Sequence, residues 1–281
     1  MTPMTFDRAD RFRSLHDPRQ PLLLPTVWDV AGALVAQGAG AQALATTSAG
    51  VAWSRGVPDG DHLGRAEVLS VVAAVAEAVD VPVSADLEGG YAASAAGVAD
   101  TVRGVTQAGA VGINLEDGPR SPEETGQRVA AARRAADDEG VPVFVNARCD
   151  VYLRGLVEPA ARLDETLRRA ARYVDSGADG IFVPGVADPE TIAALAGSLP
   201  VPLNVMVGPG APAPAELARL GVARVSLGSA LAQAALTAVR RATVELLAHG
   251  SYASLAGVLD YAEVEGLLQA AAARGVTGGG R

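Results

Sequence analysis

The chain contains no lysine, so all 23 of its Lys/Arg positions are arginines. Enzymes that form a Schiff base with a lysine amine, such as pyridoxal enzymes and Schiff-base aldolases, are therefore excluded. The lysine of a nucleotide-binding P-loop is missing for the same reason. The chain also carries a formal net charge of -9 and no basic run, which argues against a surface that binds nucleic acid or an anionic membrane.

Cysteine is almost as scarce, because Cys149 is the only one. One cysteine cannot build an intrachain disulfide framework or a zinc–thiolate cluster. The first residues are polar and charged, and no apolar run has the length that a membrane span needs. These absences predict a cytoplasmic protein that does not enter a membrane.

Short apolar runs alternate with helix-forming stretches along the 281 residues. Strands that alternate with helices imply a parallel sheet, because each parallel strand needs a crossover. Eight such units predict an α/β fold of the (β/α)8 TIM-barrel type, and an open doubly wound sheet is the alternative. The expected strands are residues 22–25, 43–46, 81–85, 111–115, 141–145, 180–183, 202–207 and 224–227.

The last part of the chain is longer than an eighth unit requires. We predict one barrel domain over residues 1–281, in which residues 229–281 form a C-terminal helical extension. Surplus apolar helices would pack on a second subunit or on the chain's own barrel. We expect the first arrangement, in a homo-oligomer that is a dimer or a tetramer.

Polar side chains follow several of the predicted strands, at the end of a barrel where active sites lie. The stretch VPVSADLEGGY begins as a buried strand and then places Asp86 and Glu88 on one face, two residues apart. Glu116 ends the next strand. Acids that lie together favour a cation between them, and oxygen ligands without histidine or cysteine suit Mg²⁺ or Mn²⁺. The alternative is that these acids cap helices or pair with arginines.

Other polar residues at this rim could hold a substrate. Arg148 ends the fifth strand, and its guanidinium could grip a carboxylate or an enolate, unless it pairs with Glu116 or Asp150. Asp59 lies in the sequence GVPDG, which is typical of a turn. A second turn could offer backbone N–H groups to a substrate oxygen or be an ordinary turn, and it consists of Thr47, Ser48 and Ala49.

The remaining candidates for chemistry lie away from the rim. We expect His16, His62 and His249 on the surface. Cys149 follows Arg148 directly and so should point to the other face of its strand. We expect it to be a small buried residue rather than a nucleophile.

Together these segments resemble the isocitrate lyase/phosphoenolpyruvate mutase superfamily, from about residue 22 to about residue 241. The resemblance implies an α/β barrel with Mg²⁺, usually oligomeric, with C-terminal helices exchanged between subunits. It implies that a bond next to a 2-oxo acid is broken or formed through a metal-bound enolate of pyruvate type. The segments that carry it are LLLPTVWDVAGA, TTSAGVAWSRGVPDG, PVSADLEGGY, GINLEDG, VFVNARCD, FVPG and LNVM.

The resemblance also implies a role for each matching residue. Asp86 would bind the metal directly, while Glu88 and Glu116 would hold metal-bound waters. The catalytic positions would be Arg148, which binds substrate, together with Asp59 and Glu116 near the metal. The substrate-binding positions would be Trp28, Thr47, Ser48, Ala49, Arg148 and Asn204.

The loop after the fourth strand departs from the best-known branches of the superfamily. Its sequence, INLEDGPRSPEETGQRV, lacks the KKCGH-type motif of isocitrate and methylisocitrate lyases and the longer asparagine-bearing loop of the mutases. We therefore predict a Mg²⁺-dependent lyase, hydrolase or decarboxylase that acts on a small 2-oxo or 2-hydroxy (di)carboxylate through a pyruvate-type enolate. The alternatives are phosphoenolpyruvate/phosphonopyruvate mutase or phosphonopyruvate hydrolase, and a catalytically silent barrel that binds a carboxylate.

Overall fold

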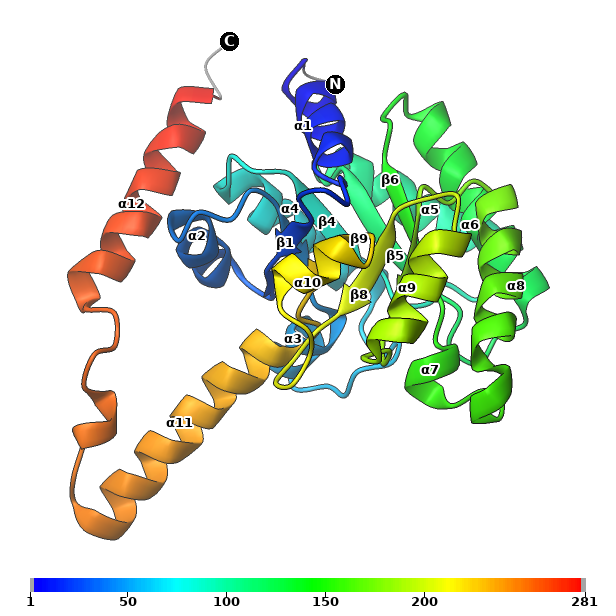
Figure 1. The fold of residues 1–281 in the computed structure, drawn as a ribbon. Coiled ribbons are helices and arrows are strands. Elements are labelled where there is room, and N and C mark those ends of the chain that lie inside the picture. Colours follow the sequence, from blue (N-terminus) through cyan, green and yellow to red (C-terminus); the bar gives the residue numbers. More distant parts are fainter. Residues whose placement is uncertain (1–2, 279–281) are drawn as a thin grey trace.

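The computed structural model describes residues 3–278, which form a parallel β-barrel surrounded by helices (Figure 1). Each strand pairs in parallel with its neighbours, in the order β1-β9-β8-β7-β6-β5-β4-β3-β2. The strands are β1 Leu22–Leu24, β2 Thr26–Val27, β3 Leu44–Thr46, β4 Val83–Asp86, β5 Gly112–Glu116, β6 Phe144–Arg148, β7 Gly180–Val183, β8 Leu203–Met206 and β9 Val222–Ser226.

The two shortest segments explain how the barrel closes. β1 and β2 are parts of one strand interrupted by Pro25, which has no N–H to donate. β1 pairs with β9, whereas β2 pairs with β3, so this strand joins the two sides of the sheet. The nine segments therefore act as the eight strands of a barrel, which confirms the predicted (β/α)8 architecture.

Helices between the strands cover the outside of the barrel. In α4, the predicted apolar face is confirmed, because Val68, Val71, Val72 and Val75 are all buried. The helices are α2 Val30–Gly38, α3 Ser48–Ser54, α4 Arg65–Ala78, α5 Ala95–Gln107, α6 Pro122–Asp138, α7 Val151–Arg154, α8 Arg162–Asp175, α9 Pro189–Ser198 and α10 Pro214–Arg219, with a 3-10 turn at Pro159–Ala161.

An N-terminal helix that the sequence did not reveal, α1 (Pro3–Ser14), covers the end of the barrel where the strands begin. Its Phe12 is fully buried and packs edge-on against Phe144, with 5.9 Å between ring centroids. The prediction that His16 lies on the surface is wrong. Its ring stacks on Phe144 at 3.9 Å, and its Nδ1 lies 2.8 Å from the carbonyl oxygen of Phe12.

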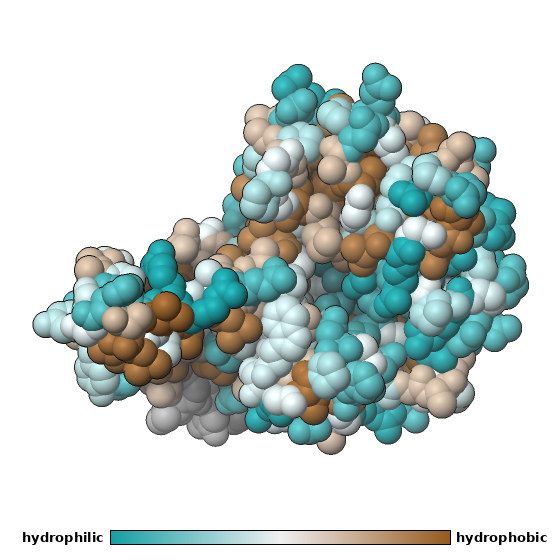
Figure 2. Space-filling view, turned by 90° about the horizontal axis from the view of Figure 1, so that it is seen from below, coloured by the Kyte–Doolittle hydropathy of each residue, from teal (hydrophilic) through white to brown (hydrophobic). Residues whose placement is uncertain are grey.

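After β9 the chain leaves the barrel. α11 (Ala230–His249) projects outward, and α12 (Tyr261–Gly278) returns beside α2 and α4, after a 3-10 turn at Ala253–Leu255 (Figure 1). Apolar side chains are exposed along this arm (Figure 2), among them Leu236, Val239 and Leu247. No helix among the described residues is long and apolar enough to cross a membrane. Residues 279–281 of the predicted extension lie outside the described chain.

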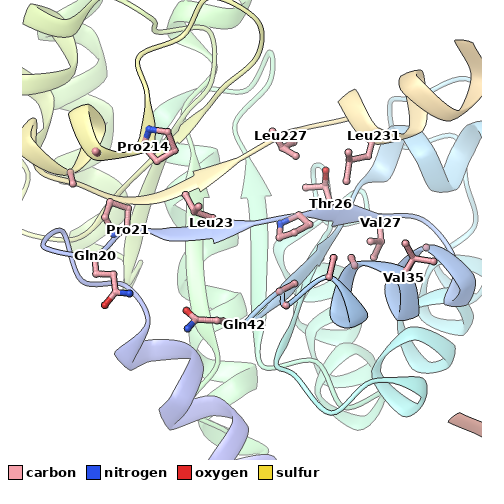
Figure 3. Close-up of a pocket in the computed structure, with 18 of the residues that line it drawn as sticks. Gln20, Pro21, Leu23, Thr26, Val27, Val35, Gln42, Pro214, Leu227 and Leu231 are labelled. Carbon is pink, nitrogen blue, oxygen red and sulfur yellow. The ribbon is translucent and has the colours of Figure 1, made fainter. Parts of the chain in front are cut away.

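The projecting course of α11 leaves the first strand uncovered on its outer side. An apolar groove of about 880 Å³ lies there, between α2, α10 and the start of α11 (Figure 3). Leu23 of β1, at the floor of this groove, is 52% exposed. A barrel strand normally has a helix on its outer face, so the groove marks the place where one is missing.

Candidate active site

Asp86, the last residue of β4, is tied to the first turn of α3. Its carboxylate Oδ2 accepts a hydrogen bond from the backbone N–H of Ser48 at 3.0 Å. Its own N–H donates to Oγ1 of Thr46 at 2.9 Å. One of the backbone N–H groups that we expected to bind substrate is therefore occupied by Asp86, and the turn helps to hold this acid in place.

Glu88 is buried and held at both carboxylate oxygens. The hydroxyl of Tyr91 donates to Oε1 at 2.8 Å, and the backbone N–H of Asp61 donates to Oε2. Burial raises the pKa of Glu88 to about 7. Glu88, Asp61 and Tyr91 all have positive φ (47°, 58° and 49°), and no other non-glycine residue of the described chain does. Backbone strain of this kind gathers at functional sites, where surrounding contacts enforce it.

Glu116 ends β5 beside the arginine that ends β6. Nη1 of Arg148 lies 2.6 Å from Oε2 of Glu116. Burial nevertheless raises the pKa of Glu116 to about 8. The charges of Asp150, Asp86 and Glu88 add to this rise, and Arg148 only partly opposes it. The structure thus gathers the three predicted metal-binding acids and the predicted arginine in one charged cluster.

Two buried aspartates, Asp150 and Asp117, fix Arg148, and its ion pair with Asp150 is one of the alternatives that the sequence left open. Its Nε and Nη2 donate to the two oxygens of Asp150, at 2.7 and 3.2 Å. The backbone N–H of Asp150 donates to Asp117, which also accepts hydrogen bonds from Arg169 and Tyr173, each at 2.8 Å. Both aspartates are fully buried. Only the fold could reveal this chain of contacts, because Arg169 and Tyr173 come from α8, more than fifty positions after Asp117.

Asp59 lies in the exposed loop between α3 and α4, but its carboxyl faces the same cluster. It hydrogen-bonds with the side chain of Ser48. Loss of hydration and the charge of Asp86 raise its pKa, while Arg148 opposes the shift. The turn that the sequence indicated therefore also brings an acid to the site.

Two predicted substrate-binding residues lie outside this cluster. Asn204 is buried inside the barrel, where its amide bonds with Asn146, Ser226 and backbone carbonyls. Trp28 lines the outer apolar groove and packs against α3 at Gly50. Their substrate contacts remain predictions.

The acids fit a hard cation that keeps much of its water. Within residues 3–278, no three His, Cys, Asp or Glu side chains are arranged to hold a metal together. Mg²⁺ does not need such a cage, because it is commonly held by one or two carboxylates and several waters. Burial, with a smaller contribution from neighbouring carboxylates, raises the pKa values of Glu88 and Glu116, and a divalent cation among these acids would favour their charged forms. Asp86 would bind the cation directly, and Glu88 and Glu116 would hold its bound waters.

Comparison with known proteins agrees with this geometry. The sequence pattern of the family described as phosphoenolpyruvate phosphomutase matches residues 12–247. The chain belongs to this family. The predicted superfamily is thereby confirmed.

Three similar proteins show the range of the phosphoenolpyruvate phosphomutase relatives. An uncharacterised protein of Mycobacterium tuberculosis is 40% identical over 82% of this chain and 86% of its own. A structure of oxaloacetate acetylhydrolase with an inhibitor superposes with TM-score 0.84 at 25% identity, over 98% of both chains. Phosphonopyruvate hydrolase in complex with oxalate and Mg²⁺ gives TM-score 0.81 at 26% identity, over 97% of this chain and 99% of that one.

Other relatives include 2-methylisocitrate lyase of Escherichia coli, 31% identical over 68% of this chain and 67% of its own. Oxaloacetate decarboxylase 2 of Pseudomonas putida is 30% identical over 61% of this chain and 57% of its own. The superfamily thus includes lyases, mutases, decarboxylases and hydrolases, which supports an enzyme of this kind. Among these relatives, the phosphonopyruvate hydrolase structure contains Mg²⁺ together with oxalate.

Proposed function

We propose that this protein is a Mg²⁺-dependent lyase, hydrolase or decarboxylase that acts on a small 2-oxo or 2-hydroxy (di)carboxylate. The observation that carries the proposal is the way in which Arg148 is held beside the acids. Its guanidinium has five N–H groups. Asp150 accepts hydrogen bonds from two of them, and Nη1 forms an ion pair with Glu116 at 2.6 Å. The remaining N–H groups on the two terminal nitrogens form no hydrogen bond within the described chain, and they can bind a substrate carboxylate or enolate oxygen.

Each residue of the charged cluster would have its own role. Arg148 would bind the substrate and stabilise the negative charge that develops on the enolate. Tyr91 and Asp61 would hold Glu88, and Ser48 would hold Asp86. We favour Asp59 over Glu116 as the acid–base group, because Asp59 forms no salt bridge within the described chain, whereas Glu116 is paired with Arg148 at 2.6 Å. Bound Mg²⁺ would act as a Lewis acid toward the substrate oxygen.

A pyruvate-release assay tests this proposal directly. The panel contains oxaloacetate, phosphonopyruvate, 2-methylisocitrate and alkylmalates, each with Mg²⁺ and with chelator. We expect release from one member, only with Mg²⁺, and loss of release in Asp86→Ala. Asp100→Ala, which changes an exposed acid on α5, is the matched control and should retain activity. Undiminished turnover in Asp86→Ala with chelator present would refute the metal requirement. Metal-dependent binding without turnover of any member would favour a silent carboxylate-binding barrel.

Hydrolysis of phosphonopyruvate is the second candidate. Similarity to phosphonopyruvate hydrolase over nearly the whole chain supports it. Phosphorus NMR of phosphonopyruvate incubated with the protein separates the possibilities, because hydrolysis yields inorganic phosphate, whereas the mutase reaction yields phosphoenolpyruvate. An unchanged spectrum would exclude both.

The oligomer is also a proposal, and two unpartnered surfaces support it. The chain has a barrel face without its covering helix and an apolar helix, α11, that lies away from its own barrel. The two surfaces complement each other, so a second copy could place α11 where the first copy lacks a helix. Light scattering after size exclusion should give a dimer or a tetramer, and Leu247→Glu should weaken the association. A monomeric wild-type protein would contradict the proposal.

A further inference from the structure

A second arginine approaches the cluster from α7. Arg154 is the last residue of this helix, and its Nε donates to Oδ2 of Asp150 at 2.9 Å. Its Nη2 lies 4.0 Å from Oε1 of Glu116. The side chain is 47% exposed, so it stands at the mouth of the site and not inside it. Its guanidinium nevertheless lies within reach of two acids of the cluster.

Arg148 and Arg154 are neighbours because they share one carboxylate oxygen. Oδ2 of Asp150 accepts from Nη2 of Arg148 at 3.2 Å and from Nε of Arg154 at 2.9 Å. Two guanidinium groups with the same charge repel each other unless a negative group lies between them. Asp150 supplies that group, and Glu116 lies close to both arginines. The pair therefore presents two adjacent cationic groups at the rim.

The backbone also fixes the position of Arg154. Its N–H donates to the carbonyl of Asp150 at 2.9 Å, and the helix ends at once because Gly155 adopts a left-handed conformation with φ of 60°. Gly155 makes this turn without the strain that a side chain would bring. The arginine is thus held where the strand end meets the mouth of the site, on the same rim as Arg148.

Asp150 does not need Arg154 in order to be satisfied. Arg148 already binds both of its oxygens, and Asp117 holds its backbone. Asp150 is fully buried, and Arg148 would still compensate its charge if the half-exposed Arg154 were absent. Stability therefore gives a weak reason for a second arginine here. The terminal nitrogens of Arg154 form no hydrogen bond within the described chain, which leaves them available to a ligand.

We propose that Arg154 is a specificity-determining residue that binds a second anionic group of the substrate, while Arg148 binds the reacting end. This inference rests on the proposed function and narrows it to substrates with two anionic groups. A carboxylate and a phosphonate share the necessary chemistry, since each offers two or more oxygens to a guanidinium. The charge of the second anionic group, and not only the length of the substrate, would then determine how tightly an acid binds.

Malate and lactate make a matched pair of probes, because they share the 2-hydroxy acid end and only malate has a second carboxylate. Binding is measured by calorimetry in Mg²⁺ for the wild type, Arg154→Gln and the control Arg103→Gln, which changes an exposed arginine of α5. We expect the wild type and the control to bind malate about 10- to 100-fold more tightly than lactate, as hydrogen bonds to a charged group allow. Arg154→Gln should remove this preference and leave lactate binding within about twofold. Methylphosphonate and phosphonopyruvate, compared with acetate and pyruvate, extend the test to a phosphonate.

The outcomes separate the two proposals. A preference for malate that survives in Arg154→Gln would overturn the role of Arg154 and leave the proposed function intact. Equal losses for malate and lactate would also overturn it, because they would indicate a general disturbance of the site. Failure of the wild type to bind either acid with Mg²⁺ would refute the substrate class itself, and with it this inference.

Discussion

Both ends of the barrel bury charged groups, but the mouth buries a cluster of acids and the closed end buries an arginine. At the mouth, burial and neighbouring carboxylates raise the pKa values of Asp59, Glu88 and Glu116. At the closed end, Arg224 is fully buried, donates to Asn114 at 3.1 Å and lies over the ring of Phe12 at 5.9 Å. Burial lowers its pKa only to about 9, so it remains a cation at neutral pH.

This difference distinguishes the mouth, which is suited to binding a ligand, from the closed end, which is suited to packing. The mouth combines strained backbone with a cluster of acids around Arg148, which are features of a functional site. At the closed end, Nε and Nη1 of Arg224 are buried without a hydrogen-bond partner in the described chain, and aromatic rings and an amide surround this arginine in place of acids. Substitutions at the mouth should therefore change activity more than stability, and substitutions at the closed end should do the reverse.

Phe12→Ala should produce the largest effect, at the closed end. Phe12 is fully buried between Phe144, His16 and Arg224, so its removal leaves a cavity at the base of the barrel. We expect a loss of about 3–5 kcal/mol in the free energy of unfolding. Denaturant unfolding measures it. Activity per folded molecule should stay within about twofold of wild type. A larger loss of activity per folded molecule would contradict the view that the closed end serves stability rather than activity.

Arg148→Lys should give the next largest effect, at the mouth. A lysine keeps the charge but cannot reach Asp150, Glu116 and a substrate oxygen together, because it lacks the planar fork. We expect kcat/KM for pyruvate release to fall by roughly 100- to 1000-fold, as for the loss of one transition-state donor. Arg103→Lys on the surface is the control. A fall of less than tenfold would contradict the substrate role of Arg148.

Tyr91→Phe should have a smaller effect, through Glu88. The substitution removes the hydroxyl that donates to Oε1 at 2.8 Å and leaves the ring. Groups that orient metal ligands typically change metal affinity by about 10- to 100-fold, and we expect the lower end because Asp61 still holds the other oxygen. Mg²⁺ titration of the apoprotein measures the change. Tyr252→Phe, on the exposed arm, should leave Mg²⁺ affinity unaltered.

The sequence predicts the barrel and the identity of the clustered residues because both depend on local patterns. Strands at 180–183 and 202–207 are found almost as predicted. Asp86 ends its strand, but Glu88 lies beyond it in a turn with φ of 47°, so the predicted period of two does not place its side chain. The strand predicted at 141–145 lies at Phe144–Arg148, because its first residues form the approach to the sheet. Local apolar character alone could not place that boundary.

Contacts between distant segments could not be predicted in the same way. Among residues 5–14 of α1, only Ala9 and Phe12 are buried and many others are charged, so no apolar period marks it as a core helix. The contact of Asp61 with Glu88 joins two loops, and the positive φ of Glu88 follows from this contact and not from its residue type. Arg154 resembles any surface arginine until its shared contact with Asp150 is seen.

The smallest expected effect concerns pH and His16 at the closed end. Burial and the charge of Arg224 lower the pKa of His16 to about 3, from 6.5 in an unfolded chain. Below pH 6.5 the unfolded chain gains a proton that the folded one does not, so stability falls as the pH drops from 6.5 toward 3. Between pH 7 and 5.5 this loss is about 1 kcal/mol. His16→Phe keeps a ring against Phe144 and should reduce the acid sensitivity by that amount, measured by denaturant unfolding at both values. An equal loss in both proteins would show that His16 is protonated in the folded state, and the closed end would then tolerate a second cation beside Arg224.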